Sequence, residues 1–299
     1  MSTLILVLFL LLGAYVVAVI EEWSATGYLR LAGPARAALR LLGTESVLPR
    51  KSDRLFFEAA PVLLLVAAIL SLAIIPLAPG VIVTDLATGA LFFNAALAYV
   101  LVALIMGGWG PDGAYGMIGG WRFLGQLIGY SMLVVMPITA VAMRAESLST
   151  MVIVQSQEQL WNILYQPLGL VLFVLAGMAA AFVPPFDLPT GAGDLAGGVE
   201  AEYTGVRRLV FRLGRMVLIL SVASAVTVFY LGGWLGPVLP GWAWSAIKIL
   251  AVTAAMLVGG RMLPRVREAA FLAWCWKLGI PLALANIFLV GVLVLVVPL

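Results

Sequence analysis

Residues 1–20 read MSTLILVLFLLLGAYVVAVI, an apolar run about as long as a helix must be to cross the hydrocarbon core of a bilayer. Glu21 and Glu22 follow this run and no cluster of positive charge precedes it, so we expect a retained membrane span and not a cleaved signal peptide. Seven further apolar runs of near-spanning length follow along the chain. The eight runs cover residues 3–20, 59–77, 86–106, 124–141, 168–183, 216–234, 242–258 and 278–297.

Composition also indicates a membrane protein. Hydrophobic residues make up 64% of the 299 residues and charged residues only 10%, whereas soluble domains carry about 25% charged residues. So little polar surface cannot cover a globule in water, and the bilayer must be the solvent. The sequence therefore predicts an all-α integral membrane protein of eight transmembrane helices with long cytoplasmic loops, forming a single polytopic domain over residues 1–299.

The positive charges predict the orientation of this domain. All of the 17 lysines and arginines except Arg144 and Lys248 lie in the first, third, fifth and seventh connections between the runs. Connections rich in Lys and Arg stay in the cytoplasm. We therefore expect both termini outside and a multi-pass protein of the cell's inner (cytoplasmic) membrane.

Several classes of function are disfavoured by residues that the sequence lacks. There is no histidine, and Cys275 is the only cysteine, which excludes haem ligation by histidine, iron–sulfur sites and typical zinc sites. We therefore expect no bound redox centre in this chain. No catalytic signature of a soluble enzyme is present, so we expect no autonomous catalytic activity. We expect no nucleic-acid partner.

Five groups of motifs occur in order along nearly the whole chain and together resemble one family. They resemble the NuoH-like membrane subunits of complex I, a family whose members include the bacterial NuoH proteins and mitochondrial subunit 1. The motifs are Gly33-Pro34 with Pro49 to Asp53; Gly107-Gly108-Trp109 with Tyr115, Gly119-Gly120, Arg122, Gln126 and Tyr130; Pro185-Phe186-Asp187-Leu188-Pro189 with Asp194 and Glu202-Tyr203-Thr204-Gly205; Gly232-Gly233-Trp234; and Lys248 with Leu263-Pro264-Arg265 and Trp276-Lys277.

This resemblance implies a function within an assembly. It implies the membrane-arm heel subunit of a respiratory NADH:quinone oxidoreductase, a translocase with quinone as its substrate. The subunit would form part of the quinone-binding chamber and the start of the proton-coupling path. Its partners would be peripheral iron–sulfur and quinone-site subunits, other membrane-arm subunits, and lipids.

The resemblance and the cost of placing charge at a membrane edge select two overlapping sets of candidate residues. A quinone needs a polar pocket for its headgroup and an apolar tunnel for its tail. The candidates for the quinone chamber are Glu21, Arg30, Gly33, Pro34, Arg122, Phe186, Asp187 and Asp194. The candidates for the charged network are Asp194, Glu202, Lys248 and Arg265.

Each charged candidate also has a plainer interpretation. Arg122 and Lys248 could reach the interface as membrane anchors, and Asp187 could cap a turn or helix. Asp194 and Glu202 would share a face if the segment between them were helical. Glu200 is expected to be ordinary surface.

The chain departs from the family pattern at several acidic positions, so we regard it as a divergent member. Ser131 follows Tyr130 where the family has a glutamate, and Thr190 and Ala192 replace acids after the Pro-Phe-Asp motif. Two alternatives remain. One is the homologous subunit of a group 4 membrane-bound hydrogenase-type complex, and the other is a small-solute transporter, although no internal repeat of the transporter kind is evident.

Overall fold

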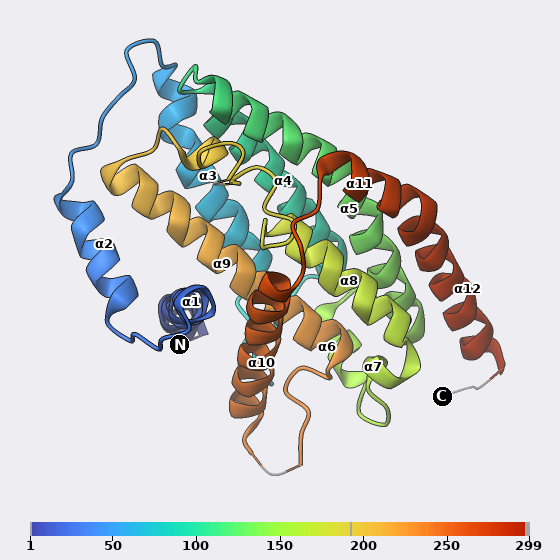
Figure 1. Cartoon of the computed structure of the whole chain (residues 1–299). Coiled ribbons are helices and arrows are strands. Elements are labelled where there is room, and N and C mark those ends of the chain that lie inside the picture. The colour runs from blue at the N-terminus through green and yellow to red at the C-terminus, as the bar shows by residue number, and fades with distance from the viewer. Residues whose placement is uncertain (1, 192, 238, 297–299) are drawn as a thin grey trace.

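The computed structural model describes residues 2–191, 193–237 and 239–296, and most of these residues lie in helices (Figure 1). The elements are α1 (Ser2–Thr26), α2 (Gly33–Gly43), α3 (Arg54–Ala73), α4 (Gly89–Trp109), α5 (Ala114–Ala145), α6 (Thr150–Gln155), α7 (Asn162–Tyr165), α8 (Pro167–Ala180), the 3₁₀ turn η1 (Gly198–Glu200), α9 (Gly205–Tyr230), α10 (Gly241–Met262), α11 (Glu268–Trp274), the π-helical turn η2 (Cys275–Gly279) and α12 (Ile280–Val296).

Seven helices in the described part of the chain are long and apolar enough to cross a membrane, where the sequence predicted eight spans. The remaining apolar run, 168–183, forms the 14-residue helix α8. At 1.5 Å per residue such a helix is about 21 Å long, shorter than a hydrocarbon core of about 30 Å. It ends early because Phe182 has a left-handed φ of 40° and a Pro-Pro sequence follows.

The final predicted run also differs from the observed helix. The apolar helix begins at Glu268, ten residues before the predicted start, and runs through α11, η2 and α12. Residue 297, the predicted end of the run, lies outside the described residues. The early start is explained by the sequence 268–277, which mixes apolar and charged residues but contains no proline or glycine to stop a helix.

Helix α9 forms the centre of the bundle. Every residue from 216 to 230 is buried, as expected for a helix that is apolar on all sides. It packs against α3, α1, α2, α8 and α10, and in Figure 1 it crosses the view between α1 and α2 on one side and α8 on the other. One pair of polar groups in this core is formed by Ser71 Oγ of α3, which lies 2.8 Å from Ser221 Oγ of α9.

The predicted runs leave residues 107–123 as a connection, but most of this glycine-rich segment is helical. Only residues 110–113 connect α4 to α5, and α5 begins at Ala114. The glycines serve close helix packing instead: a Cβ on Gly108 would lie 2.3 Å from Gly116 O across the two helices. Glycines on adjoining helices permit such an approach.

Backbone and side-chain hydrogen bonds join four connections on one side of the bundle. Asp53 N donates to Gly110 O over 2.8 Å, Ser46 Oγ to Thr204 O over 3.4 Å, and Val266 N to Pro185 O over 3.2 Å. The connections 27–53, 110–113, 181–204 and 263–267 therefore lie together, and we call this end of the bundle the loop side.

Candidate functional site

A cavity of about 590 Å³ lies between α1, α2, α3 and α9 and reaches the end of α10. Most of its lining is apolar, including Leu10 and Ala14 of α1, Ala38 of α2 and Met216 of α9. We call it the inner cavity. Its charged lining residues are Glu21, Glu22, Glu200, Arg212, Arg215 and Arg261.

Glu21 and Arg215 form the central ion pair of the inner cavity. Arg215 Nη1 lies 3.0 Å from Glu21 Oε1, and the two side chains are only 16% exposed for Arg215 and 20% for Glu21. The Arg215 guanidinium also lies 5.5 Å from the centre of the Phe182 ring, and Arg261 Nη2 donates to the Glu21 carbonyl over 3.4 Å. The pair therefore ties together the ends of α1, α9 and α10 and the start of the 181–204 connection.

Glu200 is a site residue that the sequence reasoning missed. It was expected to be ordinary surface, but it is half-buried and lines the inner cavity with Arg215. Its Oε1 is buried and has no hydrogen-bond partner among the described residues. The signal that could have revealed it is the spacing of Arg208, Arg212 and Arg215, which places three cations on one face of α9 and calls for an acid nearby.

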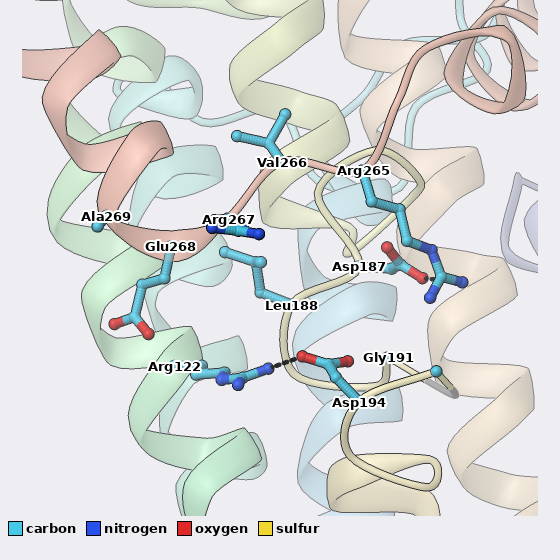
Figure 2. A pocket seen from close by; sticks show the side chains of 11 residues that line it. Arg122, Asp187, Leu188, Gly191, Asp194, Arg265, Val266, Arg267, Glu268 and Ala269 are labelled. Carbon is cyan, nitrogen blue, oxygen red and sulfur yellow. Dashed lines mark hydrogen bonds and ion pairs between the residues drawn. The ribbon is translucent and has the colours of Figure 1, made fainter.

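A second cavity, of about 610 Å³, lies at the surface of the loop side, and we call it the loop cavity. Figure 2 shows four of its charged residues coming from three places: Arg122 from α5, Asp187 and Asp194 from the 181–204 connection, and Arg265 from the segment before α11. Arg267 and Glu268 also line this cavity. Arg122 Nη1 donates to Asp194 Oδ2, and Arg265 Nη2 lies 3.0 Å from Asp187 Oδ2. Four of the predicted residues thus meet around one cavity as two ion pairs.

The two acids of the loop cavity differ in environment. The hydrogen bond from Arg122 holds the pKa of Asp194 below its ordinary value, against a smaller opposing effect of burial. The Asp194 side chain is 57% exposed, whereas that of Asp187 is 12% exposed. Water therefore screens the carboxylate of Asp194 more than that of Asp187.

Hydrogen bonds from α5 hold the start of the 181–204 connection in place. The buried Gln126 Nε2 donates to the carbonyls of Ala179 and Phe186, each over 2.8 Å. The Phe186 ring is buried and lies 5.2 Å from the Phe271 ring. Phe186 was expected in the quinone chamber, but the structure places it in the packing beneath the connection and not among the residues that line the inner or loop cavity.

Asp194 and Glu202 do not share a helical face. Turns follow Asp194, and the three-residue η1 is the only helical turn described between the two acids. Glu202 is exposed, and its carboxylate lies beside Gly113, 3.2 Å from where a Cβ of that residue would be. Glu202 is not among the lining residues of the inner or loop cavity.

The candidate residues in α2 and in the segment before it line two different sites. Pro34 lines the inner cavity, as expected of a chamber residue. Arg30 and Gly33 line a separate cleft of about 590 Å³, together with Arg36 and Arg40. We call this the arginine cleft. The two sites adjoin, because Glu22 and Ala37 line both.

Lys248 lies apart from the other predicted network residues. It precedes Arg261 by 13 residues on α10, which places it about 20 Å farther along the helix and away from the loop side. Its Nζ donates to the carbonyls of Leu231, Gly233 and Leu235 over 2.7, 3.0 and 2.8 Å. The ammonium also lies 4.2 Å from the centre of the Trp161 ring. The structure therefore joins Lys248 to the turn after α9 and not to Asp194, Glu202 or Arg265.

Comparison with known proteins agrees with this geometry. A family model described as NADH dehydrogenase matches residues 2–291. The chain is 37% identical over 250 residues to the second H-type subunit of NADH-quinone oxidoreductase from Cereibacter sphaeroides strain ATCC 17029, covering 83% of this chain and 79% of that protein.

Two Bacillus proteins match over more of the chain. It is 32% identical over 307 residues to the H-type subunits of NADH-quinone oxidoreductase from Bacillus cereus strain B4264 and Bacillus mycoides strain KBAB4, covering 97% of this chain and 92% of each relative. This chain, a multi-pass helical protein with a charged, partly apolar cavity on its loop side, therefore belongs to the NADH dehydrogenase family that includes the H-type subunits of NADH-quinone oxidoreductase.

Proposed function

We propose that this chain is the membrane-arm heel subunit of an NADH:quinone oxidoreductase and supplies part of its quinone chamber. The observation that carries the proposal is the inner cavity, which is apolar along α1, α2 and α9 and charged where Glu21 and Arg215 meet. A quinone likewise has an apolar part, its tail, and a polar part, its headgroup. Binding pockets usually combine apolar walls with a few precisely placed polar groups.

The charged end of the inner cavity suits quinone reduction. Negative charge develops on the quinone oxygens as electrons arrive, and a fixed cation such as Arg215 stabilises such charge. Glu21 and Glu200 are carboxylates in the same lining and can exchange protons there. Electrons would come from a partner subunit, since we expect no redox centre in this chain.

We place the start of the proton-coupling path at the loop cavity. Its two ion pairs, Arg122 with Asp194 and Arg265 with Asp187, each place a carboxylate beside a cation, and Arg122 lowers the pKa of Asp194. Glu202 lies on the same side of the bundle and would extend this network. Lys248 has no place in it, because its ammonium binds carbonyls at the far end of α10.

We further propose eight membrane crossings with both termini outside, in the cell's inner membrane. The connections of the loop side, together with the first or last turns of the helices that adjoin them, carry 11 of the 17 lysines and arginines, which favours a cytoplasmic location of this side. In this topology α8 is the short crossing. Over half of its residues are buried in the bundle, and irregular backbone at membrane depth is tolerated where protein covers it.

The loop side is the proposed docking face for peripheral iron–sulfur and quinone-site subunits, because the inner cavity, the loop cavity and the arginine cleft all lie there. The names of the relatives favour an NADH-quinone oxidoreductase over a hydrogenase-type complex. A solute transporter is disfavoured for the same reason, and other membrane-arm subunits and lipids would cover the apolar flanks.

Substitution of the loop cavity tests this proposal. Asp187→Asn and Arg122→Gln should each lower NADH:quinone reductase activity while the complex still assembles. Assembly is measured by electron transfer from NADH to a soluble artificial acceptor and by co-purification of the peripheral subunits. Wild-type quinone turnover in both variants would show that the loop cavity takes no part in the reaction.

A further inference from the structure

The arginine cleft is separate from the chemistry proposed above, and its composition is unusual for this chain. Three guanidinium groups line it, from Arg30, Arg36 and Arg40, against the single carboxylate of Glu22. None of these arginines belongs to an ion pair within the described residues, whereas Arg122, Arg207, Arg215 and Arg265 all do. The cleft therefore carries net positive charge that the described part of the chain does not neutralise.

The cleft lies beside the spanning helix α1. The segment that leads into α2 folds back along α1, because Tyr15 Oη donates to the carbonyl of Leu31. Tyr15 precedes Glu22 by seven residues, so it lies about 10 Å farther into the span, at 1.5 Å per residue. Helix α2 itself has no buried residue. A helix held on the flank of a spanning helix in this way is placed in the interfacial layer of a bilayer.

Apolar side chains surround the arginines. Tyr28, Leu29 and Leu31 are 64–70% exposed before α2, and Leu39 and Leu42 are 67% and 54% exposed on it. Arg36 and Arg40 are one turn apart and share a face of α2, with Leu39 beside Arg36 at the edge of this face and Leu42 farther round the helix. A cationic face beside exposed leucines is typical of helices that lie in the membrane interface and bind anionic lipids.

We propose that the arginine cleft binds the headgroup of an anionic phospholipid, with its phosphate among Arg30, Arg36 and Arg40 and its acyl chains along the exposed leucines. Guanidinium groups bind phosphate oxygens in paired hydrogen bonds. A free phosphate ion would use the arginines but leave the leucines uncovered, and an acidic protein would have to enter the interfacial layer. Because the cleft and the inner cavity share Glu22 and Ala37, the bound lipid would also hold α2 against α1.

The test is photo-labelling of the purified complex with a phosphatidylglycerol that carries a diazirine near its headgroup. Labelling should fall on residues 27–43. Arg36→Gln/Arg40→Gln should lower it on the order of 20-fold, since one arginine near an anionic lipid surface contributes about five-fold in affinity. Arg50→Gln/Lys51→Gln is the matched control, because it removes two exposed charges outside the cleft and should leave labelling unchanged.

Competition identifies the ligand. Unlabelled phosphatidylglycerol should abolish the labelling, whereas phosphatidylcholine and millimolar inorganic phosphate should not. If the double variant does not assemble, Arg40→Gln alone should lower labelling about five-fold. Undiminished labelling in these variants, or equal competition by phosphatidylcholine, would overturn the proposal. Competition by inorganic phosphate would reassign the cleft to a soluble anion, and absence of labelling in the complex would assign it to a covering subunit.

This inference does not depend on the proposed quinone site. Labelling measures lipid binding alone, and it can succeed or fail whatever occupies the inner cavity.

Discussion

Glu21 at the end of α1 and Arg215 in α9 pair at 3.0 Å although 194 positions separate them in the sequence. Both side chains are largely shielded from water, and both line the inner cavity. The contact closes the charged end of an otherwise apolar space, and the proposed quinone chemistry depends on it.

Glu21→Gln should lower NADH:quinone reductase activity about ten-fold, because it removes a charge-assisted hydrogen bond worth about 1.5 kcal/mol while preserving side-chain shape. Activity is measured in membranes and normalised to electron transfer from NADH to an artificial acceptor. Glu45→Gln is the control, since Glu45 is exposed and lines neither cavity. Equal activity of the two variants would show that quinone reduction does not depend on the charge of Glu21.

The ion pair of Arg122 and Asp194 predicts a specific pH dependence of stability. Arg122 lowers the pKa of Asp194 below its ordinary value of 3.8. A carboxyl whose pKa is lower in the folded state stabilises the fold above its unfolded pKa, and loses that effect as pH falls through the folded pKa. The stability difference between wild type and Asp194→Asn should therefore be constant above about pH 5 and shrink below about pH 4.

Thermal unfolding of the detergent-solubilised protein at a series of pH values measures this difference. A difference that instead changes between about pH 5 and 8, where this pair has no titration, would show that another group controls it.

Two adjacent glycines of α10 provide a matched pair for the packing of the 181–204 connection. A Cβ on Gly260 would lie 1.9 Å from Pro184 O, whereas one on Gly259 would meet no described atom within 4 Å. Gly260→Ala should displace the connection that carries Asp187 and lower quinone turnover several-fold. Gly259→Ala should keep full turnover and stabilise the helix by up to about 1 kcal/mol. Equal turnover in both would mean that this contact does not position the connection.

Lys248→Met should affect stability and not quinone chemistry. It would leave the carbonyls of Leu231, Gly233 and Leu235 without their shared donor, at a cost of about 3 kcal/mol. We expect a lower Tm with an unchanged KM for quinone in the assembled complex. Lys277→Met, at an exposed position, should change neither. A loss of quinone turnover without a change in Tm would return Lys248 to the charged network.

The sequence predicted the membrane class and the family, because apolar runs and motifs are local properties of the chain. It could not predict what three-dimensional contacts decide. The fifth apolar run predicts a helix of near-spanning length, but the backbone at Phe182 ends that helix after 14 residues. The glycines of segment 110–123 resemble a loop in composition, and only the facing helix shows that they allow close packing.

The sequence likewise predicted one part of the candidate site and missed another. Charge at a membrane edge was enough to select Glu21, Arg122 and Asp187, which do line cavities. It could not distinguish Glu200 from exposed acids, because burial by α9 and α1 is invisible in sequence. The sequence also could not show that Lys248 binds backbone carbonyls. Every residue has a carbonyl group, and only the folded structure determines which three lie around the ammonium.

The most direct measurement is a density map of the assembled complex with a quinone bound. We predict density for the headgroup or tail in the inner cavity, between α1, α2 and α9, with Glu21 and Arg215 at its charged end and peripheral subunits over the loop side. A quinone bound elsewhere, with the inner cavity closed by this chain's own side chains, would contradict the account.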